Sequence, residues 1–232
     1  MRATGSWIIK GKRMALPADM DIAAPVALPL LALDKVLFPQ AVLTLTVTDP
    51  VYLNLVKACL KTQAPLGIVS VVAVENGAQH HEKMPVFSEV GTLAKITSHS
   101  EVQGNGKRDI QNGMIVQCQG TQRFVYSRIV RGLNGLRIAQ DARLLPVDLP
   151  TMIPDVLQHC SDSLRKLVTA LLMQGKSSFT TPYMFADAGW VANRWAEVLP
   201  LHNDERLVLL GIRDPLERLK RVAAHIVKAQ IV

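Results

Sequence analysis

The chain has 232 residues, a formal charge of +7, and a composition that is 49% hydrophobic and 19% charged. This is the profile of an ordinary globular protein, and it excludes collagen-like, disordered and disulfide-stapled classes. No run approaches the ~20 apolar residues of a membrane-spanning helix, so we expect a soluble protein of the cytoplasm without membrane contact.

The chain opens with a basic leader, residues 1–26. Four basic residues and no acid lie in its first part: Arg2, Lys10, Lys12 and Arg13. We interpret the leader as disordered or as not native, with Met14 or Met20 as the true start. The alternative is contact with nucleic acid or acidic lipid through charge alone.

Residues 27–149 carry the pattern of strands, interrupted by one helix. The helix is predicted from Asp49, which can cap it, and Pro50, which suits its first position. Gly120-Thr121 is interpreted as a two-residue hairpin turn between two strands. The predicted strands have period-two alternation or β-branched runs, and they cover 43–47, 67–74, 91–97, 114–119 and 122–130.

Residues 150–232 change to the period of helices. A first apolar stripe from Leu157 to Leu172 ends at Gly175, and Asp187 can cap a second helix. A third begins near residues 203–204. The last helix starts at Asp214 and Pro215, with Glu217 predicted to complete a capping box. Strands followed by helices predict an α+β protein, a β-rich domain joined to a helical bundle.

Motifs for catalysis or cofactors fail on residue or on context. Gly175-Lys176-Ser177 resembles the end of a phosphate-binding loop, but Ala170 stands where the motif needs glycine, and a helix precedes it. Gly104-Asn105-Gly106-Lys107 is interpreted as a hairpin tip. We therefore predict no catalytic residue and no cofactor.

Metal and thiol chemistry are also weakly indicated. His80-His81-Glu82 offers too few ligands for a convincing metal site, and we interpret it as a solvated loop. Cys59, Cys118 and Cys160 are far apart and odd in number, which favours reduced thiols. Cys118 and Cys160 are predicted to be small core residues rather than nucleophiles.

Six short motifs carry a family resemblance in order along the chain. They are Leu28-Pro29-Leu30, Val36-Leu37-Phe38-Pro39, Leu66-Gly67-Ile68-Val69, Val90-Gly91-Thr92-Leu93-Ala94-Lys95-Ile96, Gly120-Thr121-Gln122-Arg123-Phe124 and Arg206-Leu207-Val208-Leu209-Leu210. Together they resemble the Lon N-terminal domain family, the substrate-binding domain of Lon proteases, over about residues 28–227. Gly189 to Glu197 is similar to the free-standing bacterial members.

The resemblance implies a PUA-like β pseudo-barrel followed by a helical bundle. One departure is Val51, where the family often has an arginine before the tyrosine that is Tyr52 here. We expect no ATPase or Ser-Lys peptidase domain after Val232, and hence a non-catalytic module rather than a protease. By resemblance its partners are unfolded or partly folded polypeptides.

A candidate binding surface lies between the first two predicted helices of the bundle. Four apolar residues crowd this connection: Phe179, Tyr183, Met184 and Phe185. They form either a polypeptide-binding lip or a packed bridge within the fold. The alternative function is RNA binding by a PUA-like fold, using the leader with Arg123, Arg128 and Arg131. A hydrolase is a third hypothesis, for which the sequence offers no site.

Overall fold

The computed structural model describes residues 6–9, 12–15, 26–76, 83–102, 113–132, 134–176 and 179–229. The chain divides into two compact units. Residues 1–39 and 43–146 form one, here called the β unit, and residues 40–42 and 147–232 form the other, the helical unit. The predicted α+β class, with strands first and helices afterwards, is confirmed. The domain bounds 27–149 and 150–232 stay predictions beside this division.

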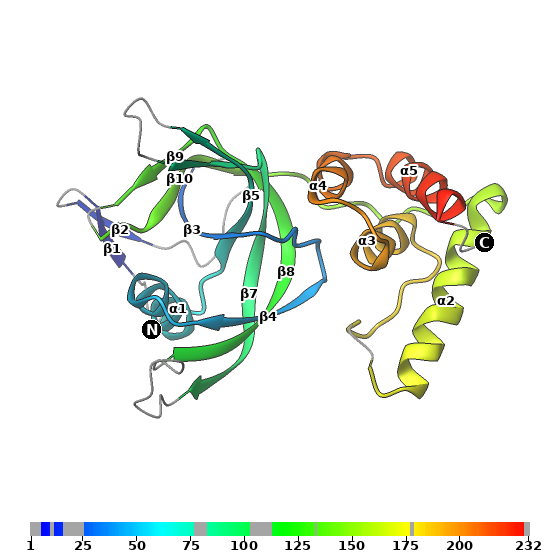
Figure 1. Cartoon of the computed structure of the whole chain (residues 1–232), viewed down its shortest axis with the longest axis horizontal. Helices are drawn as coiled ribbons and strands as arrows, with labels where there is room; N and C mark the ends of the chain where they lie inside the picture. The colour runs from blue at the N-terminus through cyan, green and yellow to red at the C-terminus, as the bar shows by residue number, and fades with distance from the viewer. Residues whose placement is uncertain are drawn as a thin grey trace. The chain divides into compact units, whose positions relative to one another are not determined.

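The β unit contains ten strands and one α-helix in the described part of the chain. Their bounds are β1 Ser6–Ile9, β2 Lys12–Ala15, β3 Val26–Leu33, β4 Val42–Val47, α1 Pro50–Thr62, β5 Leu66–Asn76, β6 Lys83–Phe87, β7 Val90–Val102, β8 Gly113–Val125, β9 Arg128–Arg131 and β10 Arg137–Leu144 (Figure 1).

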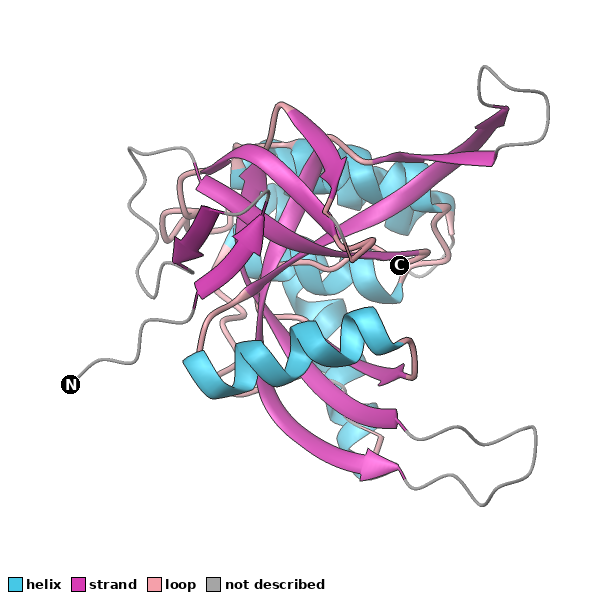
Figure 2. Ribbon diagram, turned by 90° about the vertical axis from the view of Figure 1, so that its left-hand side faces the viewer, coloured by secondary structure: helices cyan, strands magenta, loops and turns pink. Residues whose placement is uncertain are grey.

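Eight of these strands form one sheet that turns back on itself. Its order is β4-β8-β7-β5-β3-β10-β9, with β6 paired to β5. β8 also pairs with β10 through Leu144 and Phe124, which brings together two strands that lie far apart in that order. Figure 2 shows the resulting curvature of the strands. β3 and β5 are parallel, and β4 and α1 lie between them in sequence.

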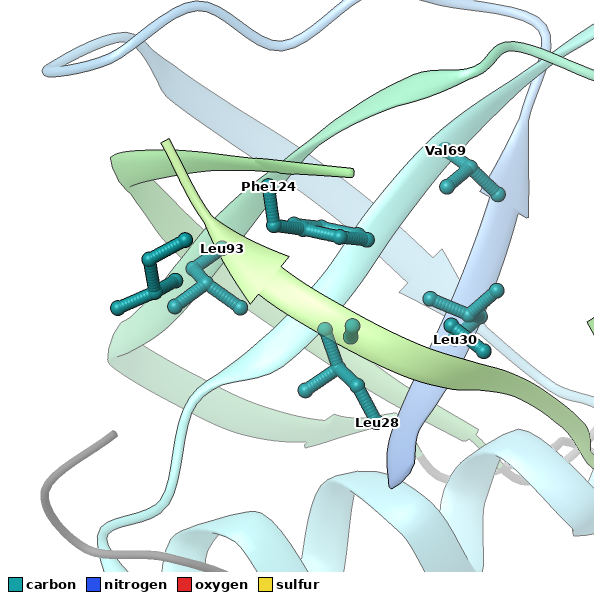
Figure 3. Packing of buried hydrophobic residues seen from close by; sticks show 8 residues of the cluster. Leu28, Leu30, Val69, Leu93 and Phe124 are labelled. Carbon is teal, nitrogen blue, oxygen red and sulfur yellow. The ribbon is translucent and has the colours of Figure 1, made fainter. Parts of the chain in front are cut away.

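The core of the β unit surrounds Phe124, which is fully buried. Figure 3 shows its ring among Leu28, Leu30, Val69 and Leu93, whose side chains come from several strands. Burying large apolar side chains of this kind supplies about 1.5–3 kcal/mol each. Phe124 is therefore a central residue of this core.

The hairpin predicted at Gly120-Thr121 is wrong. β8 runs without interruption from Gly113 to Val125, and the chain breaks instead at Tyr126 and Ser127 before β9. A side chain at position 120 would collide with the carbonyl oxygen of Phe38. Glycine is needed here for a close backbone approach inside a strand rather than for a turn.

Helix α1 begins as the sequence predicts. The Asp49 carboxylate accepts a hydrogen bond from the Val51 amide at 2.7 Å, and Pro50 occupies the first helical position. Its buried face presents Leu55, Val56 and Cys59. This cap satisfies an amide that has no partner inside the helix.

Part of the leader is paired in the structure. β1 and β2 form an antiparallel two-stranded sheet, with Ser6 opposite Ala15 and Ile9 opposite Lys12. The sequence predicts no regular structure in residues 1–26, so the pairing of β1 with β2 differs from that prediction. In this pairing, backbone groups of the two strands bond to one another. Whether the leader is native stays a prediction.

The helical unit contains four α-helices and one short 3₁₀ helix in the part that the structure describes. They are η1 Asp155–Leu157, α2 Gln158–Met173, α3 Ala188–Val198, α4 Asn203–Gly211 and α5 Pro215–Lys228. α3 is buried from Ala188 to Ala196, so it is the central helix of this unit. The Trp195 indole donates a 2.8 Å hydrogen bond to the Cys160 carbonyl and joins α3 to α2.

The predicted helix starts and stops mostly hold. Gly175 follows α2 with a φ of 65°, a left-handed conformation that glycine tolerates. Asp214 caps α5 by accepting from the Leu216 amide at 2.9 Å. The capping box predicted for α5 is wrong: the Asp214 carboxylate accepts from the Leu216 amide rather than from the Glu217 amide, and the Glu217 carboxylate lies 3.7 Å from the Lys220 ammonium. Leu172, which the sequence assigns to the apolar stripe, is 48% exposed.

Candidate functional site: an aromatic surface between two helices

The candidate surface is the segment 179–187, here called the aromatic connection, which leads from α2 to α3. Its C-terminal end is fixed by Asp187. One carboxylate oxygen of Asp187 accepts from the Trp190 amide at 2.6 Å and caps α3. The other accepts from the Thr151 amide at 2.9 Å. One side chain therefore starts a helix and also holds the strand-like segment that enters the helical unit.

The middle of the connection is held to α2. The Ser161 hydroxyl, which is buried on α2, donates a 2.6 Å hydrogen bond to the backbone carbonyl of Phe185. The Arg165 guanidinium lies 4.4 Å from the centroid of the Phe185 ring, a cation–π geometry. These two contacts fix both the backbone and the ring of Phe185.

Three aromatic rings gather around this point. The centroid of Phe185 lies 5.2 Å from that of Trp190 in an edge-on arrangement and 5.7 Å from that of Tyr183. Tyr183 lies 6.2 Å from Trp190. Such pairs are each worth about 0.5–1.5 kcal/mol beyond the area that they bury. The cluster is therefore built before any ligand arrives.

The four predicted residues divide into two groups. Phe179 is only 6% exposed, and the Arg194 guanidinium lies 5.9 Å from its ring centroid. Tyr183, Met184 and Phe185 each keep part of their surface exposed. The structure thus brings Tyr183 and Phe185 together and places Phe179 as a buried anchor.

A buried ion pair lies on α3 close to this anchor. Arg194 and Glu197 approach to 2.6 Å, and the Arg194 side chain is 1% exposed. Burial lowers the pKa of Arg194, while the carboxylate of Glu197 opposes that shift. Burial raises the pKa of Glu197 to about 7, against the opposing effect of Arg194. This pair is costly to bury, so it indicates specificity of packing more than stability.

Sequence reasoning missed the exposed apolar residues on the other side of Asp187. Met152, whose backbone forms an isolated bridge with Asp187, is 84% exposed. Leu149 and Val156, which flank it in sequence, are also strongly exposed. The spacing of these apolar residues along the sequence matches neither a helix nor a strand, so it gives no signal of a surface. Only the backbone bridge to Asp187 shows that Met152 lies beside the aromatic connection.

The described residues offer little for nucleophilic or metal chemistry. All three cysteines are free and buried, as predicted for Cys118 and Cys160. Burial raises the pKa of the Cys59 thiol to about 12 and that of each of the other two to about 11. A protonated, buried thiol is a poor nucleophile. The described part of the chain contains no cluster of three metal-ligating side chains, and His80-His81-Glu82 lies outside it.

The arginines of the RNA alternative lie in different environments. Arg123 is 4% exposed on β8, so it is poorly placed to contact a phosphate. Arg128 and Arg131 are exposed at the two ends of β9. Gly104-Asn105-Gly106-Lys107, predicted as a hairpin tip, falls outside the described residues. No described helix is long and apolar enough to cross a membrane.

Comparison with known proteins defines the class. Residues 27–228 match the family described as the ATP-dependent protease La (LON) substrate-binding domain. The chain belongs to this family, which confirms the resemblance drawn from the sequence motifs. No curated protein matches the sequence.

Two solved structures show the same fold over most of the chain. One is a Lon N-terminal domain protein from Xanthomonas campestris, with 26% identity, a TM-score of 0.63, and coverage of 86% of this chain and 98% of that one. The other is the N-terminal domain of a Mycobacterium avium complex Lon protease, with 16% identity, a TM-score of 0.56, and coverage of 86% and 97%. The PUA-like assignment and the cytoplasmic location stay predictions.

Proposed function

We propose that this protein is a non-catalytic module that binds unfolded or partly folded polypeptides through exposed apolar segments. The family match over residues 27–228 carries the proposal, because the family is described as a substrate-binding domain. Tyr183 and Phe185, which are partly exposed, supply a surface of matching chemistry in the helical unit. Large, rigid aromatic side chains give contact area at little cost in conformational entropy.

The contact residues in this proposal are Tyr183, Met184 and Phe185, with Met152 at their edge. Asp187 and Ser161 hold the backbone of the connection, so binding orders few additional groups. Such preorganisation favours affinity, since less freedom is lost when the partner binds. Phe179 supports the surface from a buried position instead of touching the partner.

The experiment compares capture of a reduced, carbamidomethylated unfolded protein by the wild type and two variants. Tyr183→Ala with Met184→Ala is expected to reduce capture at least fivefold and to lower the free energy of unfolding by about 1–2 kcal/mol, since both side chains are only partly buried. The same preparations are expected to hydrolyse no ATP and to cleave no unfolded substrate.

Phe179→Ala is the matched control within the same connection. It is expected to lower the free energy of unfolding by about 3–5 kcal/mol, the cost of removing a buried phenylalanine. If Tyr183→Ala with Met184→Ala lowers the free energy of unfolding as much as Phe179→Ala does, the surface is core and the residue assignment is wrong. If the folded wild type retains no unfolded protein, binding of unfolded chains through exposed apolar segments is refuted.

A further inference from the structure

Two arginines of the β unit lie directly opposite each other on neighbouring strands. Arg131 on β9 pairs with Arg137 on β10 in the antiparallel register. Side chains of directly opposed residues point to the same face of the sheet, with Cβ atoms about 4.5–5.5 Å apart. Two positive charges at that spacing destabilise the sheet, so the pairing needs an explanation.

Arg137 is held in place by two aromatic residues. It donates a hydrogen bond from Nη1 to the hydroxyl of Tyr52, in the first turn of α1. Its guanidinium lies 5.3 Å from the centroid of the Phe87 ring on β6. The side chain is half-buried, whereas Arg131 is exposed. An arginine held in this way presents its remaining N–H donors in a fixed direction.

Neither arginine forms an ion pair with a carboxylate in the described part of the chain. The contacts of Arg137 there are with Tyr52 and Phe87, which leave most of its five N–H donors for other acceptors. The Tyr52 hydroxyl accepts from Arg137, and among the described residues its own proton has no acceptor. Two guanidinium groups and one hydroxyl therefore provide donors for an anion.

The chemistry of this donor set matches a carboxylate. A guanidinium binds a carboxylate through two parallel N–H···O bonds, and bonds to a charged acceptor are about twice as strong as neutral ones. β9 is the last strand in the order of the described sheet, so an extended chain has an edge to follow there. The site suits a nucleic acid less well, because base stacking needs a free ring. The guanidinium of Arg137 already lies over Phe87, the ring on which a base would stack.

We propose that Arg131, Arg137 and Tyr52 form a carboxylate-binding site for an acidic, extended polypeptide segment that lies along β9. The choice of a polypeptide as occupant rests on the proposed function, and the anion chemistry rests on the paired arginines. The site gives the module a preference for substrates that carry Asp or Glu beside apolar residues. Its three residues belong to the β unit, whereas the aromatic connection belongs to the helical unit.

The test uses fluorescence anisotropy of a labelled, disordered 12-residue peptide that contains three glutamates, and of the same peptide with glutamines. The wild type is expected to bind the glutamate peptide at least tenfold more tightly. Arg137→Gln and Arg131→Gln are each expected to remove most of this difference. Arg128→Gln is the control, because Arg128 stands on β9 three residues from Arg131 and faces the other side of the sheet.

A second readout needs no ligand. Removing one of two opposed like charges relieves repulsion, so Arg131→Gln is expected to raise the midpoint of thermal unfolding at low salt, and the gain should shrink as salt is added. Arg128→Gln is expected to leave the midpoint unchanged. A fall in the midpoint for Arg131→Gln would show that this arginine is already paired, and would overturn the site.

The remaining outcomes also decide whether the carboxylate-binding site stands and what occupies it. Equal affinity for the two peptides, or an equal loss with Arg128→Gln, would replace the site with general charge attraction. If a single-stranded RNA of 12 nucleotides displaces the glutamate peptide, with loss of RNA binding in Arg131→Gln and Arg137→Gln, the occupant is a nucleic acid and the proposal is wrong. Retained glutamate preference in a protein that captures no carbamidomethylated chain would support the carboxylate site and refute capture through the aromatic connection.

Discussion

Arg218 on α5 is a buried charge that bonds to three other segments of the helical unit, and its removal tests the packing directly. Its side chain is 1% exposed and bonds to the Asp148 carboxylate at 2.6 and 3.3 Å. It also donates to the Asn193 amide oxygen at 3.1 Å and to the carbonyl of Ile212. The Arg218 side chain thus joins α5 to the segment that contains Asp148, to α3 and to the connection between α4 and α5.

The cost of Arg218→Ala follows from these contacts. Removing one partner of a buried ion pair costs about 3–5 kcal/mol, because the other desolvated charge loses an oppositely charged partner. The Asp148 side chain is 17% exposed, so water reaches it and the expected loss lies at the low end, about 3 kcal/mol. Arg218→Lys is expected to recover only part of this, since a lysine cannot form the two-pronged contact.

The assay is urea denaturation followed by far-ultraviolet circular dichroism, with the free energy of unfolding extrapolated to water. Lys220→Ala is the control on the same helix, where Lys220 and Glu217 form a 3.7 Å pair with side chains 61% and 52% exposed. Such pairs contribute about 0–1 kcal/mol. A loss below about 1 kcal/mol for Arg218→Ala, similar to that control, would refute the role given to the buried pair.

Two further predictions concern α3 and the β unit. Burial raises the pKa of Glu197 from 4.5 to about 7, so the folded state holds this proton more tightly than the unfolded state does, and stability falls as pH rises across that range. Glu197→Gln should flatten the slope of unfolding free energy between pH 5 and 7, and an unchanged slope would contradict the assignment. Gly91→Ala should cost about 1–3 kcal/mol in the same assay, because its Cβ would lie 2.7 Å from the Ile68 carbonyl oxygen. Gly211→Ala should not destabilise the protein, because its Cβ would meet no atom within 4 Å beyond its chain neighbours and its own helix backbone. Equal losses at the two glycines would refute the steric argument.

The local features of the fold could be predicted from sequence. Asp49, Asp187 and Asp214 each cap the helix that the sequence assigns to them. Caps and helical periods depend on residues a few positions apart, so the sequence contains most of their physics. The change from strands to helices near Pro146 is a signal of the same kind, and the family motifs agree with it.

Features that depend on long-range register could not be predicted. Gly120 is read as a turn because glycine is common in turns, yet it lies inside β8 against the backbone of Phe38, which comes far earlier in the chain. The aromatic connection shows the same limit. Its composition predicts a cluster, but only the packing around Arg194 decides that Phe179 is buried while Tyr183 stays partly exposed.

The sequence by itself determined the α+β class, the helix boundaries and the family of this protein, because capping, hydrophobic period and ordered motifs are local or read in line along the chain. Only the tertiary structure decided which side chains meet. Nothing in the sequence pairs Arg131 with Arg137, and Tyr52 and Phe87 lie far from them along the chain. The strand register places the two arginines face to face, and the packing of α1 and β6 brings the hydroxyl and the ring to Arg137.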